Sequence, residues 1–365
     1  MEGMGVNIDF WRNKKILITG HTGFKGSWLS LWLQRLGAEV IGASLEPPTN
    51  PNLYEQANVV SGMVNHHVDI CDLYALKTIF KEFKPEIVFH LAAQSLVRYS
   101  YREPVETYQT NVMGTMNVLE SIRNINTVRS AVMVTTDKCY ENREWVWGYR
   151  ENEPMGGHDL YSSSKGCAEL LIASYRNSYF PTDSYESHCT SIASVRAGNV
   201  IGGGDWAEDR LVPDIIRAFK ANKPARIRNP HSIRPWQHVL EPLAGYIKLS
   251  EMLYNSGSEY AEAWNFGPNE EDAKPVELIV KTMAEQWGDG AHWIVDKGDH
   301  PHEANYLKLD CSKAYTRLQW RPKWNLGYAL AKITDWYRAD IQGSDLRAVC
   351  MDQIEEYMSA TGVCV

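Results

Sequence analysis

Residues 15–26 read KILITGHTGFKG, and this stretch decides the fold. Its first part is a short apolar run of β-branched character, which predicts a strand. Three glycines follow with the spacing G-x-x-G-x-x-G. Apolar residues then recur at helical spacing over residues 28–36, and Gly37 ends that pattern as a helix C-cap would. The sequence therefore predicts a strand, a glycine turn and a helix in succession.

A glycine turn in this position is typical of a dinucleotide site. Glycines let backbone amides approach a pyrophosphate, and the helix N-terminus adds a partial positive charge. The same spacing also occurs in tight turns with close helix packing, but the flanking strand and helix favour the dinucleotide. The second predicted strand, at residues 39–44, ends near Ser44 and Glu46, where a cofactor ribose would be met. No Arg or Lys stands between Ser44 and Pro48 to face a 2′-phosphate, so we expect NAD rather than NADP.

Further apolar runs alternate with helical patterns, which predicts the fold class α/β with a doubly wound parallel Rossmann sheet. We place the end of a third strand at residues 68–70, a fourth strand at 87–91, a fifth at 131–134 and a sixth at 191–196. The small residues Ala92 and Ala93 follow the fourth strand and would let a cofactor lie close to the backbone. A simple exit from the strand would explain them equally well.

The fifth strand runs into polar residues that can carry acid–base chemistry. Thr136, Asp137 and Lys138 follow it directly, and Tyr161 stands four positions before Lys165. Four residues is just over one helical turn, so the phenol and the amine share one helix face. Strand ends carry the chemistry in open α/β sheets. These residues together offer a phenol, two amines, a carboxylate and a hydroxyl, and residues 141–159 form a polar loop that we expect over the site.

Beyond residue 196 the pattern becomes richer in loops, and we expect a smaller mixed α/β C-terminal lobe that binds the substrate. Four basic residues gather between positions 226 and 234, although a solvated charged surface is the usual explanation of such a group. The HPHE run at residues 300–303 has the residue types of a metal site. Adjacent ligands in a loop with proline make poor geometry, so we expect no metal.

The domain boundaries follow from these patterns. We place the NAD-binding domain at 14–197 with returning segments near 236–267, the substrate lobe at 198–235 and 268–330, and a C-terminal helical extension at 331–365.

Composition excludes several classes of protein. The 365 residues are 44% hydrophobic and 22% charged, which is ordinary for a globular protein, and no run of 18 apolar residues predicts a membrane span. The N-terminal residues lack the apolar region of a secretory signal, so we expect a cytoplasmic protein. The seven cysteines never form a C-x-x-C pair, which argues against a zinc site. A net charge of −8 argues against nucleic-acid binding.

Three motifs resemble those of the extended short-chain dehydrogenase/reductase family. Residues 19–26 resemble its T-G-x-x-G-x-x-G turn, residues 161–165 resemble its Y-x-x-x-K pair, and Thr136 stands where the family has a catalytic hydroxyl. Within that family the chain is similar to the nucleotide-sugar 4,6-dehydratases, because the acidic Asp137 follows the threonine. The resemblance covers about residues 14–330.

Three segments are similar to the branch of these dehydratases that acts on CDP-glucose, namely TDK at 136–138, NVIGGGDW at 199–206 and RPW at 234–236. Dehydratases for dTDP- and GDP-sugars usually place Glu where this chain has Lys138, and in them that Glu is the base at C5. The base need not be a carboxylate, because a desolvated lysine can be neutral near physiological pH.

The resemblance implies conversion of CDP-glucose to CDP-4-keto-6-deoxyglucose with one NAD, a step of deoxysugar and O-antigen biosynthesis. Tyr161 takes the proton of the C4 hydroxyl, once Lys165 and the cationic nicotinamide have lowered its pKa, while Thr136 hydrogen-bonds the same oxygen. Lys138 removes the C5 proton and Asp137 protonates the departing C6 hydroxyl. Asp137 must be buried to hold that proton at neutral pH.

The resemblance also implies two sets of ligand contacts. The cofactor set is Gly20, Thr22, Gly23, Phe24, Lys25, Gly26, Ser44, Asp69, Ile70, Leu91, Ala92, Ala93, Thr135, Tyr161 and Lys165. The substrate set is Ser95, Asn199, Leu211, Arg228, Arg234 and His302, with Arg234 as a fork of donors to the diphosphate. We further expect a homodimer or homotetramer, with no nucleic-acid or membrane partner.

Three alternatives stay open. A nucleotide-sugar 4-epimerase would use Tyr161, Lys165 and Thr136 but not Asp137 or Lys138. A 4,6-dehydratase for a dTDP- or GDP-sugar would use the same machinery on another nucleotide. A dinucleotide sensor without catalysis would be expected to lose Tyr161 or Lys165, and both are present.

Overall fold

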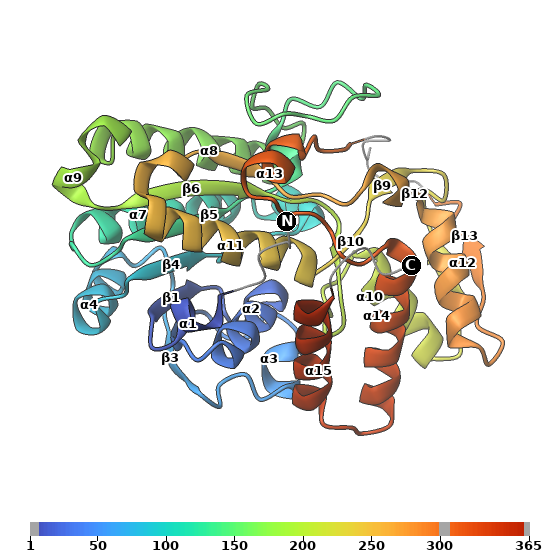
Figure 1. Cartoon of the computed structure of the whole chain (residues 1–365). Helices are drawn as coiled ribbons and strands as arrows, with labels where there is room; N and C mark the ends of the chain where they lie inside the picture. The colour runs from blue at the N-terminus through green and yellow to red at the C-terminus, as the bar shows by residue number, and fades with distance from the viewer. Residues whose placement is uncertain (1–6, 299–306, 361–365) are drawn as a thin grey trace.

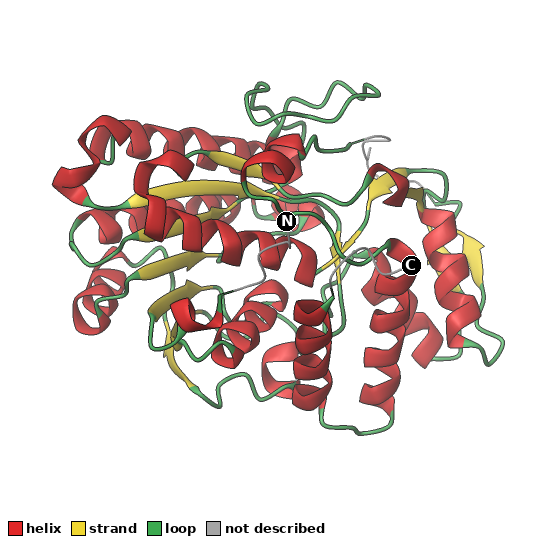
Figure 2. Ribbon diagram, in the orientation of Figure 1, coloured by secondary structure: helices red, strands yellow, loops and turns green. Residues whose placement is uncertain are grey.

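A parallel sheet of seven strands forms the middle of the molecule (Figures 1 and 2). The structure is a computed structural model, and it describes residues 7–298 and 307–360. The strands are β1 Lys15–Thr19, β2 Glu39–Ser44, β3 Met63–His67, β4 Ile87–His90, β5 Ser130–Val134, β6 Ser191–Arg196 and β11 Ala263–Asn265. Their order is β3-β2-β1-β4-β5-β6-β11, and all neighbours are parallel. The order reverses between β1 and β4, where sheets of this kind bind ligands beyond the strand ends.

Side chains alternate along each strand between two hydrophobic cores, one on each face of the sheet. On β1, Ile16 and Ile18 belong to one core and Leu17 to the other, and all three are fully buried. The first core also contains α2 and α11, and the second contains α4, α7 and α8. Helices therefore cover both faces, which confirms the predicted doubly wound Rossmann class.

The helices of the first half are α1 Ile8–Trp11, α2 Phe24–Arg35, α3 Leu53–Gln56, α4 Leu73–Phe83, α5 Val97–Arg102, α6 Pro104–Tyr108, the π-helix η1 Gln109–Gly114, α7 Thr115–Arg123, the short 3-10 helix η2 Asp137–Cys139, α8 Leu160–Tyr179, the 3-10 helix η3 Thr182–Ser184 and α9 Tyr185–His188. The later helices are α10 Leu211–Lys220, α11 Leu240–Ser256, the 3-10 helices η4 Gly257–Tyr260 and η5 Glu270–Asp272, α12 Val276–Trp287, α13 Ser312–Arg317, α14 Leu326–Ile341 and α15 Leu346–Ser359. None of the helices within the described residues is long and apolar enough to cross a membrane.

Three small two-stranded sheets lie beside the main sheet, toward the carboxyl ends of its strands (Figure 1). They pair β7 Val200–Ile201 with β10 Gln237–His238, β8 Ala225–Ile227 with β13 Trp293–Val295, and β9 Ile233–Pro235 with β12 Ala273–Pro275. The hairpin of α14 and α15 packs beside α2, and Tyr337 on α14 donates a 2.6 Å hydrogen bond to the carbonyl of Asp205. The C-terminal hairpin thus holds the loop after β7 against the nucleotide-binding half.

One strand boundary was predicted wrongly. We expected the third strand to end at residues 68–70, whereas β3 occupies Met63–His67 and residues 68–70 follow it as a connection. β3 is an edge strand, and its pairing with β2 sets its position. Its mostly polar sequence gave little hydrophobic pattern to find it by.

Residues 141–159 form a loop, as predicted, and it stands out from the body of the molecule (Figure 1). Aromatic stacking orders its inner part, where Tyr149 stacks on Tyr140 with ring centroids 5.2 Å apart. The backbone amide of Tyr149 also donates to the carbonyl of Lys308 at 2.9 Å. The loop is thereby attached to the segment that precedes α13.

Candidate active site

The glycine turn after β1 is shaped for close approach of another backbone or a ligand. Gly20 has φ +77°, and a Cβ there would lie 2.6 Å from the amide nitrogen of Ala92. A Cβ on Gly26 would lie 2.0 Å from the carbonyl oxygen of Gly20. Gly23 is the N-cap of α2 and supplies no capping side chain, so amides of the first turn stay open to an anion. These residues fit a dinucleotide pyrophosphate.

The end of β2 carries hydroxyls rather than a carboxylate. Thr22 Oγ1 and Ser44 Oγ are 2.8 Å apart, and Thr22 also donates to the carbonyl of Leu45 at 2.9 Å. Two residues further on, the Glu46 carboxylate lies 3.1 Å from His67 Nδ1 at the end of β3. A negative side chain, and no positive one, therefore follows β2.

The other candidate cofactor residues lie at further strand ends or, for Phe24, at the start of α2. Leu91, Ala92 and Ala93 form the irregular segment after β4. Asp69 accepts a 2.8 Å hydrogen bond from the amide of Cys71, and Ile70 is buried beneath Gly114. Phe24 begins α2, where a Cβ on Gly202 would touch its ring at 2.9 Å.

Four of the five candidate catalytic residues come together at the end of β5. Thr136 is the N-cap of η2, and its hydroxyl donates to Asp137 Oδ1 at 3.0 Å and hydrogen-bonds with the Tyr161 phenol. Asp137 is only 2% exposed, and its Oδ2 has no hydrogen-bond partner among the described residues. Lys165 is 4% exposed and donates from Nζ to the carbonyl of Val134 at 3.3 Å. The phenol, the hydroxyl and the carboxyl thus form one connected group, with the amine one helical turn away.

Burial sets the protonation of this group in the absence of ligands. It raises the pKa of Tyr161 to about 12, with a further increase from Asp137, while the hydrogen bond between Tyr161 and Thr136 and the charge of Arg210 act the other way. Burial also lowers the pKa of Lys165 to about 8, although the negative charge of Glu169 acts to raise that pKa. The phenol is therefore neutral near pH 7, so additional positive charge is needed to stabilise its phenolate.

Lys138 lies apart from the buried group. Its side chain is exposed, and among the described residues no ion pair joins it to Asp137. Its backbone, by contrast, is held in place by a hydrogen bond, because the Lys138 amide donates to Thr136 Oγ1 at 3.3 Å. The burial that would desolvate the amine must come from a bound sugar.

Arg210 is a site residue that the sequence interpretation missed. Its guanidinium donates to the buried Asp205 at 3.0 Å and to Ser95 Oγ at 2.9 Å. Its charge also acts on Tyr161 and on Lys25, whose pKa is lowered to about 8 by burial and by Arg210. Arg210 therefore joins the segment after β4 to the start of α10, beside the buried phenol. The NVIGGGDW segment at 199–206, which contains Asp205, was recognised in the sequence. Arg210 lies outside that segment and belongs to no motif that would have identified it.

The candidate substrate residues lie on separate elements. Asn199 follows β6 with φ +42°, and Leu211 begins α10. Arg228 follows β8 and lies 3.8 Å from Asp209, which also pairs with Arg98 at 3.1 Å. Arg234 lies on β9 and donates to the carbonyl of Ile233 at 3.0 Å. His302 lies outside the described residues.

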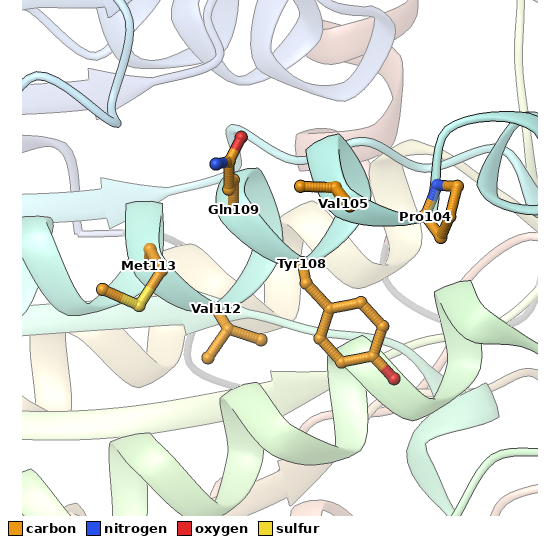
Figure 3. A pocket seen from close by; sticks show the side chains of 6 residues that line it. All are labelled: Pro104, Val105, Tyr108, Gln109, Val112 and Met113. Atoms are coloured by element: carbon orange, nitrogen blue, oxygen red, sulfur yellow. The ribbon is translucent and has the colours of Figure 1, made fainter.

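A hollow of about 430 Å³ lies away from this group, on the outer face of α6 and η1 (Figure 3). It is lined by Pro104, Val105, Tyr108, Gln109, Val112 and Met113. Tyr108 points toward α8 and donates to Ser163 Oγ at 2.9 Å. None of the candidate site residues lines this hollow.

Comparison with known proteins agrees with the geometry. The family model described as GDP-mannose 4,6 dehydratase matches residues 17–333. The CDP-glucose 4,6-dehydratase of Salmonella typhimurium is 56% identical over 98% of this chain and 99% of its own length.

Solved structures share the fold. The UDP-glucose 4-epimerase of Thermotoga maritima, solved with UDP-glucose, aligns with a TM-score of 0.77 at 24% identity, covering 89% of this chain and 99% of its own. The dTDP-glucose 4,6-dehydratase of Bacillus anthracis, solved with NAD, aligns with a TM-score of 0.74 at 20% identity, covering 92% and 99%. The resemblance seen in the motifs is thereby confirmed, and the chain belongs to the nucleotide-sugar 4,6-dehydratase family of extended short-chain dehydrogenases/reductases.

Proposed function

We propose that this protein uses NAD to convert CDP-glucose to CDP-4-keto-6-deoxyglucose. The observation that carries the proposal is the 56% identity, along nearly the whole of both chains, with the CDP-glucose 4,6-dehydratase of Salmonella typhimurium. The buried group of Thr136, Asp137, Tyr161 and Lys165 supports it, because a dehydration needs an acid for the leaving hydroxyl in addition to the Tyr and Lys pair.

In the first step the Tyr161 phenolate takes the proton of the C4 hydroxyl. Lys165 and Arg210 supply positive charge near the phenol, and the Thr136 hydroxyl fixes the position of the reacting oxygen. NAD, when bound, would supply the hydride acceptor for C4 and the hydride donor for C6. The glycine turn, the open first turn of α2 and the hydroxyls of Thr22 and Ser44 would hold it.

In the second step the C4 ketone acidifies the C5 proton, and Lys138 removes it. Asp137 gives its proton to the departing C6 hydroxyl, which leaves as water, and when the hydride returns to C6 the Lys138 ammonium gives a proton back to C5. Its position supports this role, because Asp137 is joined to the Tyr161 phenol through Thr136 and its Oδ2 has no hydrogen-bond partner among the described residues. Arg234 and Asn199 would bind the diphosphate, and Leu211, Arg228, Ser95 and His302 would line the rest of the sugar nucleotide.

The cofactor preference gives one prediction. NAD should bind cofactor-free protein at least about tenfold more tightly than NADP, because Glu46 would face a 2′-phosphate and no Arg or Lys stands at the end of β2. Titration of both cofactors by calorimetry measures the ratio. Glu46→Gln should narrow it by removing the repulsion. Equal affinities for NAD and NADP in the native protein would contradict this prediction.

The Lys138→Ala variant tests the assignment of the C5 base. It should still oxidise C4 in a single turnover and hold the 4-keto hexose, but it should lose exchange of the C5 proton with deuterated solvent. Lys138→Arg is the matched control, because it keeps the positive charge but cannot give up its proton, and it should lose exchange as well. Incorporation of deuterium at C5 is followed by mass spectrometry. Exchange at the native rate in both variants would remove Lys138 from the role of base.

A substrate panel tests the function as a whole. CDP-, dTDP-, GDP- and UDP-glucose are each incubated with the enzyme and NAD, and the 4-keto product is measured by its chromophore in alkali. We expect the chromophore with CDP-glucose and little or none with the other three. A 4-epimerase would give no chromophore, and a dehydratase for another nucleotide would give it with a different sugar.

We also infer that the chain forms a homodimer or a homotetramer. The apolar hollow on α6 and η1 supports this, because Val105 and Met113 there are 67% and 47% exposed. Exposed apolar patches of this kind mark interaction sites. Light scattering of the native protein and of Val105→Asp should give a larger mass for the native chain, and a monomeric native protein would contradict the inference.

A further inference from the structure

Glu169 continues the spacing of the candidate catalytic pair along α8. Tyr161, Lys165 and Glu169 follow one another at intervals of four residues, so all three lie on one face of the helix. The Glu169 side chain is only 3% exposed. Its Oε1 accepts a hydrogen bond from Thr135, and its Oε2 accepts from Ser194 Oγ at 2.8 Å. One carboxylate therefore ties α8 to the end of β5 and to β6.

The second oxygen also pairs with a buried arginine. Arg196 Nη2 lies 2.7 Å from Glu169 Oε2, and the arginine side chain is 4% exposed. Its other terminal nitrogen donates to the Tyr140 hydroxyl at 2.6 Å and to the carbonyl of Glu151 at 3.0 Å. Buried ion pairs of this kind seldom stabilise a fold more than apolar residues of the same volume would. The stability of the fold alone therefore does not explain why Glu169 and Arg196 are buried as an ion pair beside α8.

The charges around the Lys165 amine show which group can stabilise its protonated form. His90 on β4 is neutral, because burial lowers its pKa to about 3, and burial keeps the thiol of Cys139 on η2 neutral by raising its pKa. Lys25 on α2 also acts on Lys165, and it is a cation. Tyr161 is a neutral phenol in the absence of ligands. Of the described groups that act on Lys165, Glu169 is thus the one that brings a negative charge.

We propose that Glu169 is a positioning residue, which holds Thr135 beside the catalytic hydroxyl of Thr136 and supplies the negative charge that keeps the buried Lys165 amine protonated. The hydrogen bonds from Ser194 and Arg196 keep that carboxylate ionised and fixed. Glu169 itself does not touch the sugar. The proposal rests on the proposed function for its kinetic consequence only, because the charge state of Lys165 can be measured without a substrate.

The sign of the effect follows from the burial of Lys165. Its pKa is already lowered to about 8, so loss of the Glu169 charge should lower it further and leave about half of the amine neutral at pH 7. A shift of about one pH unit would raise the neutral fraction at pH 7 about fivefold. A neutral amine no longer stabilises the Tyr161 phenolate, so kcat should fall while KM for the sugar nucleotide stays near its native value.

The experiment measures Lys165 directly. Carbamylation by cyanate requires a neutral amine, and its rate at Lys165 is followed as a function of pH by peptide mass spectrometry. In Glu169→Gln the midpoint should move about one pH unit lower, and the basic limb of the kcat profile should move with it. Glu169→Asp keeps the charge and should restore the native midpoint. Ser194→Ala removes one hydrogen bond but no charge, and it should leave the midpoint unchanged.

The outcomes separate this proposal from the proposed function. If Glu169→Gln fails to fold because Arg196 is left unpaired, the double variant Glu169→Gln with Arg196→Met removes both charges and should show the same shift. A native midpoint in either folded variant would overturn the proposal. A shifted midpoint in a protein that gives no product from any sugar nucleotide would uphold the proposal and refute the proposed function instead.

Discussion

The Tyr161→Phe variant is expected to bind CDP-glucose and NAD but to lose oxidation of the C4 hydroxyl. Phenylalanine keeps the ring, which is 8% exposed in the structure, so the packing of α8 should be preserved. Only the oxygen that hydrogen-bonds with Thr136 and takes the substrate proton is lost. Removing a general base lowers a rate by about 10²–10⁴-fold. Reduced cofactor in a single turnover should therefore form at least about a hundredfold more slowly, while the equilibrium affinity for the sugar nucleotide stays within about twofold.

The matched control is Tyr108→Phe. That tyrosine also donates a hydrogen bond to α8, at Ser163 Oγ, but its phenol lines the outer hollow. Its loss should leave the single-turnover rate near the native value. If both variants turned over at the native rate, Tyr161 would be a packing residue and the base would have to be sought elsewhere.

The nucleotide-binding half could be predicted well because its apolar patterns and its glycine turn both indicate the strands and helices that the fold contains. The glycine turn needs its residue type at Gly20 and Gly26, where a side chain would collide with backbone. The predicted second and sixth strands match β2 and β6 residue for residue. The edge strand β3 was misplaced because its pairing with β2, rather than an apolar pattern, fixes its position.

Contacts between distant segments account for what the sequence did not reveal. Arg210 donates a hydrogen bond to Ser95, which lies 115 positions away in the sequence, and no local spacing of residues predicts such a contact. Glu169 is different, because it stands four residues after Lys165 at the same interval that identified Tyr161. The four-residue spacing of Glu169 could be read from the sequence. The role of Glu169 could not, because its partners Thr135, Ser194 and Arg196 come from two other parts of the fold.

The Asp137→Asn variant is expected to oxidise C4 normally and then to stall before loss of the C6 hydroxyl. Asparagine has nearly the shape of aspartate, and its amide oxygen can accept the hydrogen bond that Thr136 now donates to Oδ1. It has no acidic proton to give to a leaving hydroxyl, and a general acid contributes about 10²–10⁴-fold. We therefore expect reduced cofactor and a 4-keto nucleotide sugar that retains the C6 oxygen to accumulate on the enzyme. Rapid quench followed by mass spectrometry measures both. Water loss at the native rate would assign the acid to another group.

The Gly198→Ala variant distinguishes the acid from its surroundings. A Cβ at Gly198 would lie 1.8 Å from Asp137 Oδ2, so the methyl group must displace the carboxyl while leaving its chemistry intact. If Asp137 acts as the acid, this variant should also slow the loss of the C6 hydroxyl, while oxidation at C4 keeps its native rate. If Asp137 merely supports Thr136, both variants should instead slow the oxidation at C4, because the hydroxyl that loses its support acts there. The step that slows, rather than the size of the loss, therefore decides the role of Asp137.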